Sequence, residues 1–222
     1  MKKMILVSGS GDTVAWFRVE LLQEFIDRSY KVYVLAPDIR DELKPVLLDI
    51  GVEFLEIKLH RKGFNIFNLC SSIIELQKIF RSIKPDLIFS YTHKAIITAS
   101  IASRISGFTN TYSLITGTGH IFDSESLKQK ALQTLGSFAL RSALNFNRLV
   151  FFQNPDDRRL FKNKKIVNFS KTKLINGSGV NFKKFKITKL PPEPIFLCMA
   201  RLIKSKGLEE FARAAKRVKK LY

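Results

Sequence analysis

The sequence has few of the residues that build disulfide frameworks and metal centres. Its 222 residues include only two cysteines, Cys70 and Cys198. Two isolated thiols in apolar patterns favour a reducing compartment and argue against a disulfide framework. The three histidines, His60, His93 and His120, are too scattered for a zinc-binding pattern. We therefore expect no disulfide and no bound metal.

Long apolar segments, repeats and low-complexity tracts are also absent. No apolar run approaches the ~18 residues of a transmembrane helix. The run that follows Lys2 and Lys3 is too short for a signal peptide and is typical of a first strand. With 45% hydrophobic residues the chain can bury a sizeable core. These features indicate a globular cytoplasmic protein.

Acidic residues are scarce in the last third of the chain. The formal net charge is +19, of which residues 1–147 contribute +4 and residues 148–222 contribute +15. Such asymmetry predicts an anionic partner, which could be a nucleic acid, an acidic membrane face or a phosphorylated ligand. A solvated basic surface would leave the same trace.

Strand and helix patterns alternate along the first part of the chain. Strand patterns cover 3–8, 31–36, 53–57, 86–90, 111–115, 149–153 and 172–175, and helical patterns cover 15–28, 42–50, 65–83, 95–106 and 127–146. A further short helix opens after Asn154. This alternation predicts an α/β fold with a doubly wound, Rossmann-like parallel sheet, in which ligands bind at the carboxyl ends of the strands.

A second strand–loop–helix pattern follows a proline-rich stretch. Residues 195–200 are apolar and predict a buried strand, and a helical pattern begins at Leu208. Arg201 and Lys206 lie between the two. A guanidinium, an ammonium and the N-terminus of a helix together suit a diphosphate. Ordinary solvated cations in a loop are the alternative.

Two glycine-containing loops follow predicted strands. Gly9 and Gly11 come after the first strand, where a ligand can approach the backbone, although a simple tight turn leaves the same pattern. Thr116, Gly117 and Gly119 follow the strand at 111–115. Small residues there indicate close backbone approach to a phosphate or a sugar, or again a plain turn.

Two polar loops are further candidate binding sites. They are formed by Tyr91, Thr92, His93 and Lys94 after one strand, and by Arg61, Lys62 and Phe64 at the start of a helix. The first group suits a polyhydroxylated or phosphorylated ligand, with its histidine as a general base, a hydrogen-bond donor or a structural group. The second suits an anionic membrane interface or a helix start that faces the core. No catalytic triad or carboxylate pair is evident, and Asp12 has no obvious partner.

Seven stretches in this order resemble the family 4 retaining glycosyltransferases of GT-B fold, and above all bacterial members that build surface polysaccharides on lipid carriers. The stretches are Trp16–Arg18, Arg61–Gly63, Lys84–Lys94, Ile115–Phe122, Phe151–Asp157, Ile175–Asn181 and Ala200–Gly207. The resemblance runs from end to end of the chain.

The resemblance implies three segments. Residues 1–175 would form an acceptor-binding domain, 176–194 a linker, and 195–222 the start of a nucleotide-sugar-binding domain. In the family the Arg and Lys of the last motif bind the donor diphosphate, which transfers to Arg201 and Lys206. The Gly9–Gly11 loop, Arg18, the loop at 91–94 and Thr116 would lie near the cleft. Neither a metal nor another cofactor is implied.

The sequence departs from the family pattern in two places. Many relatives have a histidine where Thr116 stands, and the E-x7-E motif that contacts the donor lies beyond Tyr222. We therefore expect a truncated glycosyltransferase whose 222 residues alone are inactive.

The complete enzyme would transfer a hexose or N-acetylhexosamine, with retention, from a UDP-linked donor to a lipid-linked or glycan acceptor at the inner face of the plasma membrane. Two alternatives are open. The chain could be a non-catalytic acceptor- or membrane-docking subunit whose partner chain supplies the donor domain, or a basic nucleic-acid-binding protein. The donor sugar, its base, the acceptor and the linkage are not encoded in recognisable motifs.

Overall fold

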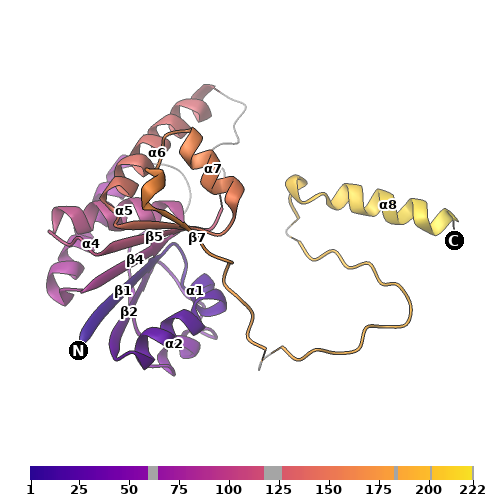
Figure 1. The fold of residues 1–222 in the computed structure, drawn as a ribbon, viewed down its shortest axis with the longest axis horizontal. Helices are drawn as coiled ribbons and strands as arrows, with labels where there is room; N and C mark the ends of the chain where they lie inside the picture. The colour runs from indigo at the N-terminus through magenta and orange to yellow at the C-terminus, as the bar shows by residue number, and fades with distance from the viewer. Residues whose placement is uncertain (60–64, 118–126, 183–184, 201, 222) are drawn as a thin grey trace. The chain divides into compact units, whose positions relative to one another are not determined.

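A seven-stranded parallel sheet forms the centre of the fold (Figure 1). The computed structural model describes residues 1–222 except 60–64, 118–126, 183–184, 201 and 222, with the backbone alone at 127–133, 205 and 221. The strands are β1 Lys2–Ser8, β2 Tyr30–Ala36, β3 Glu53–Glu56, β4 Leu87–Tyr91, β5 Thr111–Ile115, β6 Leu149–Phe152 and β7 Thr172–Leu174. Their order in the sheet is β3-β2-β1-β4-β5-β6-β7. The predicted doubly wound α/β architecture is confirmed.

Helices cover both faces of this sheet. They are α1 Gly11–Phe17, α2 Val19–Asp27, α3 Lys44–Leu48, α4 Ile66–Ile83, α5 His93–Ile105, α6 Leu127–Phe146 and α7 Pro155–Asn163, with α8 Leu208–Leu221 near the end of the chain. Figure 1 shows α4, α5 and α6 on one face of the sheet and α1 and α2 on the other. Short 3-10 turns occupy Phe169–Lys171 (η2) and Lys204–Lys206 (η3).

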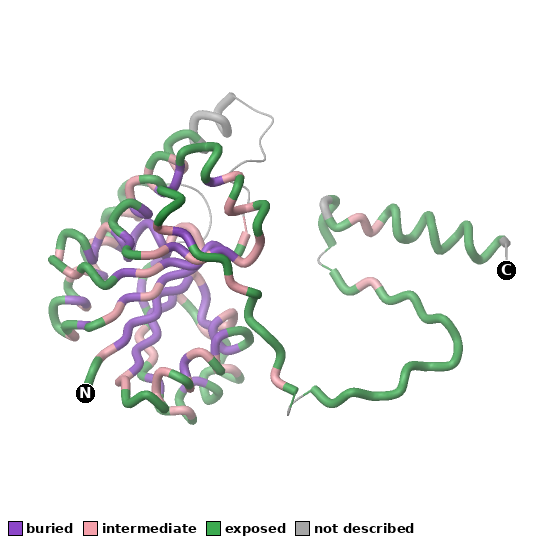
Figure 2. The backbone as a smooth tube through the Cα atoms, viewed as in Figure 1, coloured by how far each residue is buried: buried purple, intermediate pink, exposed green. Residues whose placement is uncertain are grey.

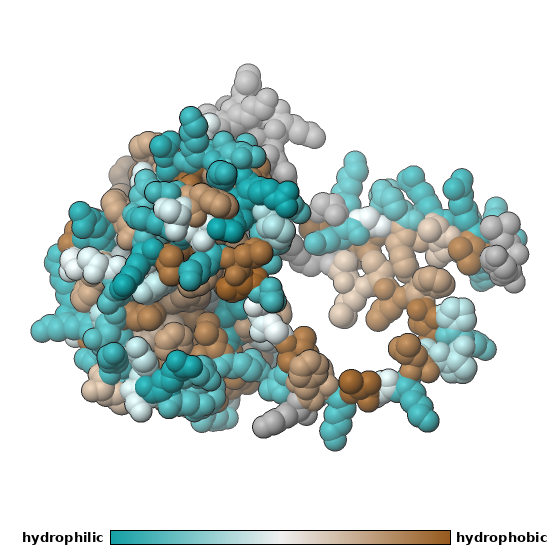
Figure 3. All heavy atoms as spheres, in the orientation of Figure 1, coloured by the Kyte–Doolittle hydropathy of each residue, from teal (hydrophilic) through white to brown (hydrophobic). Residues whose placement is uncertain are grey.

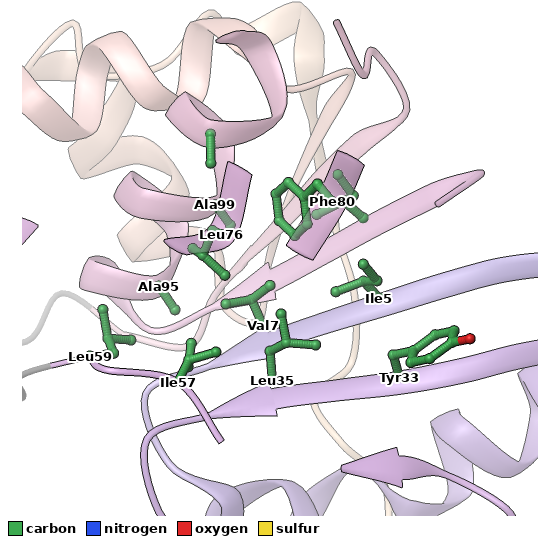
Figure 4. Close-up of a cluster of buried hydrophobic side chains, with 12 residues drawn as sticks. Ile5, Val7, Tyr33, Leu35, Ile57, Leu59, Leu76, Phe80, Ala95 and Ala99 are labelled. Carbon is green, nitrogen blue, oxygen red and sulfur yellow. The ribbon is translucent and has the colours of Figure 1, made fainter. Parts of the chain in front are cut away.

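The core consists of clusters on the two faces of the sheet. Ile5 and Val7 of β1 pack with α4 and α5, whereas Met4 and Leu6 pack with α1, α2 and α3. All four side chains are fully buried, because successive strand residues point to opposite faces. Figure 4 shows the first cluster, in which side chains of β1 and β2 point toward those of α4 and α5. A third cluster joins α5, α6 and α7 to β5 and β6.

The chain divides into two units, residues 1–179 and residues 180–222. Figure 2 shows that the buried residues lie in the sheet and along the inner sides of its helices, whereas residues 180–222 are almost entirely exposed. In the second unit the regular elements among the described residues are η3 and α8.

The predicted helix over 15–28 is two helices. α1 begins earlier, at Gly11, and ends at Phe17, and α2 begins at Val19. Arg18 between them has φ −129° and ψ 0°, outside the α-helical region. The break coincides with the burial of the Arg18 side chain, while Trp16 and Phe17 stay exposed. The predicted helix over 42–50 is also shorter, because only Lys44–Leu48 is helical.

The predicted buried strand at 195–200 is wrong. These residues have no strand structure, and Phe196 and Met199 are 78% and 91% exposed. A strand requires a neighbour to which its backbone groups can bond, and none is present among the described residues of 180–222. The helix predicted from Leu208 is confirmed as α8.

Candidate functional site

The candidate site lies at the carboxyl edge of the sheet, where the strand order reverses. β1 lies between β2 and β4, and the chain builds outward from it in both directions. At such a switch point the loops after the two central strands leave toward opposite faces, and ligands bind between them. Ser8 and Tyr91 are paired at the ends of β1 and β4. The amide of Gly9 donates a hydrogen bond of 3.1 Å to Thr92 Oγ1, so the two loops are in contact.

Gly9 and Gly11 lack side chains because neighbouring loops occupy the space. A Cβ on Gly9 would lie 2.7 Å from Thr92 Oγ1, and one on Gly11 would lie 2.5 Å from the Asp38 carbonyl oxygen. The Gly11 amide also donates to that oxygen, at 2.6 Å. Of the two interpretations of this loop, the tightly packed turn accounts for these contacts.

Asp12 has a partner, contrary to expectation. Its carboxylate accepts hydrogen bonds from the backbone amide and the Nε of Arg40, both at 2.9 Å. The Arg40 guanidinium lies over the Trp16 ring, 5.0 Å from its centroid. Asp12 therefore ties α1 to the loop after β2, and this ion pair accounts for the residue without a catalytic role.

Tyr91 and Arg18 form a buried pair beside the switch point. Tyr91 is 3% exposed and Arg18 is 6% exposed, and the Arg18 Cζ lies 4.9 Å from the centre of the Tyr91 ring. The Tyr91 hydroxyl shares a hydrogen bond of 3.0 Å with Thr13 Oγ1. Burial raises the pKa of Tyr91, so this phenol is neutral at physiological pH.

His93 joins three strand-end loops at the start of α5. It forms a hydrogen bond to the backbone of Gly117, after β5, and interacts electrostatically with Asp157, after β6. Burial lowers the pKa of His93, and these two neighbours only partly oppose that effect. The imidazole is therefore neutral near pH 7, and its buried Nε2 has no hydrogen-bond partner. A neutral Nε2 of this kind can accept a hydrogen bond from a ligand hydroxyl.

The remaining predicted site residues lie at several separate places in the structure. Thr92 is the N-cap residue of α5, with φ +70°. Lys94 is half-buried and its pKa is lowered by burial. Thr116 is exposed at the end of β5. Lys206 belongs to the second unit, where it is exposed in η3, directly before Gly207 and α8. Five predicted residues lie outside the described residues, namely Arg61, Lys62, Phe64, Gly119 and Arg201.

Sequence reasoning missed two members of this edge. Asp157 lies in the first turn of α7 and accepts a hydrogen bond of 2.8 Å from Nδ2 of the N-cap residue Asn154, and it interacts electrostatically with His93. Ser178 accepts a hydrogen bond of 2.7 Å from Arg18 Nη1. Both residues follow predicted strands, at 149–153 and 172–175, so their position after a strand end was the available signal.

Metal ligands and membrane spans are not evident in the described part of the chain. No group of three or more His, Cys, Asp or Glu side chains there is arranged to hold a metal ion. Among the same residues no helix combines the length and apolar character needed to cross a bilayer.

Comparison with known proteins gives matches over most of the chain. Residues 4–154 match the family described as glycosyl transferase 4-like. A Campylobacter jejuni protein is 23% identical over 227 residues, a match that covers 96% of this chain and 60% of the relative. That protein is named N,N'-diacetylbacillosaminyl-diphospho-undecaprenol alpha-1,3-N-acetylgalactosaminyltransferase. The chain thus spans less than two thirds of this curated relative's length.

Solved structures share the fold at low sequence identity. A glycosyltransferase from Rickettsia africae has a TM-score of 0.57 and 17% identity, covering 86% of this chain and 47% of that one. The Anabaena protein HepE, solved with UDP and glucose, has a TM-score of 0.57 and 18% identity, covering 85% and 47%. Both matches extend over about half of the larger proteins.

Proposed function

Because the chain belongs to the glycosyl transferase 4-like family, we propose that residues 1–179 are the acceptor-binding half of a retaining glycosyltransferase. The observation that carries this proposal is the meeting of strand-end loops at the switch point of one parallel sheet. The loops after β1, β4, β5, β6 and β7, with the α1–α2 junction at Arg18, bring hydroxyl, imidazole and guanidinium groups to this edge. Such groups suit a polyhydroxylated, phosphorylated ligand.

The substrates that we propose follow the chemistry named for the similar proteins. The Campylobacter relative is named for N-acetylgalactosamine transfer to a sugar on diphospho-undecaprenol, and HepE was solved with UDP and glucose. This chain would accordingly serve transfer of a hexose or N-acetylhexosamine from a UDP-linked donor, without a further cofactor. The acceptor would be lipid-linked or a glycan, in surface polysaccharide synthesis.

His93 is the residue that we assign to the acceptor sugar. Its neutral Nε2 is unpartnered, and its position is set by Gly117 and Asp157. A sugar hydroxyl that donates to Nε2 would gain a fixed orientation toward the donor. Thr116, which is exposed beside Gly117, would contact the same sugar.

We further propose that 176–194 is a linker whose first residues, 176–179, pack with the first unit, and that 195–222 begins a nucleotide-sugar-binding domain. Lys206 is exposed directly before Gly207 and the N-terminus of α8. Together with Arg201 it would bind the donor diphosphate, where cations stabilise the charge of the leaving group.

The amphipathic and basic character of α8 in the second unit supports docking of the protein on an anionic membrane. Figure 3 shows apolar side chains along one side of α8 and hydrophilic ones along the other. Phe211 and Val218 are 38% and 49% exposed, and basic residues occupy the last turn. Basic amphipathic helices bind acidic lipid surfaces. The same helix favours the second candidate function, a docking subunit whose partner chain supplies the donor domain.

A transfer assay on a chimera tests the proposed function. The chimera joins these 222 residues to the part of the Campylobacter relative that lies beyond the match. We expect radiolabelled N-acetylgalactosamine to pass from its UDP donor to a lipid-diphosphate-linked N-acetylhexosamine, whereas the 222-residue chain alone gives little or no transfer. His93→Ala should lower the rate about 10- to 100-fold, because the acceptor hydroxyl loses its fixed orientation.

The control for the chimera is its binding of UDP, which depends on the added half. A chimera that binds UDP but transfers no sugar to any lipid-diphosphate-linked acceptor contradicts the proposed function. Robust transfer by the 222-residue chain alone contradicts the assignment of the donor site to a separate half.

A further inference from the structure

Arg18 is a buried cation with no counter-ion among the described residues. It is 6% exposed, and no Asp or Glu among the described residues forms an ion pair with it. Its Nη1 donates to the carbonyl of Phe17 at 3.1 Å and to Ser178 Oγ at 2.7 Å. Its buried Nε has no hydrogen-bond partner, and Nη2 makes none with the described residues. Fully buried arginines are normally paired, because an unpaired buried charge is costly.

The Tyr91 ring holds this guanidinium without satisfying its donors. Cζ lies 4.9 Å from the ring centroid, and the ring is fixed by the hydrogen bond between Tyr91 and Thr13. A cation–π contact offsets part of the desolvation cost. It engages the face of the guanidinium and leaves the N–H donors of Nε and Nη2 without an acceptor among the described residues. The Nε–Nη2 edge therefore retains the parallel donors that match two oxygens of a phosphate.

We propose that the Nε–Nη2 edge of Arg18 binds a phosphate of the acceptor's lipid diphosphate, with the Ser178 hydroxyl as a second ligand. This inference rests on the proposed function, which makes the acceptor lipid-linked. Arg18 lies beside Tyr91 at the end of β4, on the edge that would hold the acceptor sugar at His93. The donor diphosphate is assigned to the second unit, so the phosphate at Arg18 belongs to the acceptor.

The loop that carries Ser178 contacts the Nη1 side of the guanidinium, and its glycines allow it to adjust to a ligand. Ser178 is exposed and stands between Gly177 and Gly179, which have φ values of +81° and +75°. It also receives a hydrogen bond of 3.4 Å from Gln153 Nε2. Glycines on both sides permit backbone rotations that other residues resist. A hydroxyl both accepts and donates hydrogen bonds, so Ser178, which accepts one from Arg18 Nη1, can also donate one to a phosphate oxygen.

Calorimetric titration of the full chain with geranyl diphosphate tests this inference. Arg18→Lys keeps the charge but loses the fork of donors, and Arg18→Gln loses both. We expect each to weaken binding about 10-fold or more, and Ser178→Ala to weaken it about 2- to 10-fold. Arg40→Gln is the matched control, because Arg40 also lies over an aromatic ring but is paired with Asp12 and Glu42. The affinity of the Arg40→Gln protein for geranyl diphosphate should equal that of the wild type.

Circular dichroism of each variant shows whether it is folded, and exposed Ser178 provides a test even if the Arg18 variants unfold. The inference is overturned if folded Arg18→Lys binds geranyl diphosphate as the wild type does, or if the folded wild type does not bind it. It is also overturned if UDP binding falls in parallel, since Arg18 would then serve the donor.

Transfer by the chimera is an independent readout. If geranyl diphosphate binding depends on Arg18 but the chimera transfers no sugar, only the proposed function is contradicted. If the chimera transfers sugar but geranyl diphosphate binding does not depend on Arg18, only this inference is contradicted.

Discussion

At the residue scale, Gly11 in the first loop and Gly136 in α6 differ in the space around their ideal Cβ positions. Gly11 is in contact with the backbone of the loop after β2, and a Cβ would lie 2.5 Å from the Asp38 oxygen and 2.6 Å from Ile39 Cβ. Gly136 lies inside α6, and beyond the adjoining helix backbone no atom of the described residues lies within 4 Å of its ideal Cβ position. The same substitution should therefore have opposite effects at the two positions.

We predict that Gly11→Ala lowers the free energy of unfolding by about 1–3 kcal/mol, because the loops must separate. Gly136→Ala should raise it by about 0.5–1 kcal/mol, because alanine loses less entropy in a helix. Urea denaturation of both variants measures the two changes. A Gly11→Ala protein as stable as the wild type would show that the contact between the two loops is not as close as described.

His93 makes stability depend on pH. Burial lowers its pKa below the ordinary value of 6.5, so the unfolded chain binds a proton that the folded chain does not yet accept. Stability is therefore complete above pH 6.5 and falls as the pH drops below it. We predict that the difference in unfolding free energy between wild type and His93→Asn shrinks as the pH falls from 7.5 to 5. Because both proteins contain His60 and His120, the contributions of these residues cancel in the difference. A difference in unfolding free energy that does not change with pH would contradict the burial of His93.

At the element scale, the end of α4 carries local strain. Lys84, the C-cap residue, has φ 54° and ψ 66°, a left-handed conformation that costs a non-glycine residue about 1–2 kcal/mol. Its side chain is exposed, so its removal costs little packing. We predict that Lys84→Gly raises the free energy of unfolding by about 0.5–1 kcal/mol.

The matched control for Lys84 lies in the interior of the same helix. Lys78 is exposed in α4, and Lys78→Gly should lower the free energy of unfolding by about 1 kcal/mol. Chemical denaturation of both variants gives the comparison. If both substitutions destabilise the protein equally, Lys84 is not in the left-handed conformation.

Element types were predictable from the sequence, because periodicity reports which side of a segment is buried. The alternation of strands and helices gave the parallel sheet and the edge where its loops gather. The break at Arg18 was not predictable, since an apolar face continues across it and the Arg18 side chain is buried against Ser178, which is distant in sequence. The apolar run at 195–200 was misread because hydrophobicity does not show whether a strand has a neighbour. The meeting of His93 with Asp157 likewise depends on strand order.

At the scale of the whole molecule, we propose that the two units recognise different substrates. The loops of residues 1–179 meet at the switch point of a complete sheet, and there we place the acceptor. The second unit has η3, α8 and an exposed apolar segment among its described residues. For this reason the chain alone should bind an acceptor analogue more readily than a nucleotide sugar.

Hydrogen exchange of the 222-residue chain, with and without a geranyl-diphosphate-linked N-acetylhexosamine, tests this division most directly. The account predicts slower exchange on binding at the loops that follow β1, β4, β5, β6 and β7, with the loops at the amino edge of the sheet unchanged. Protection confined to the amino edge or to residues 180–222, or no protection at saturating ligand, would contradict the placement of the acceptor at the carboxyl edge.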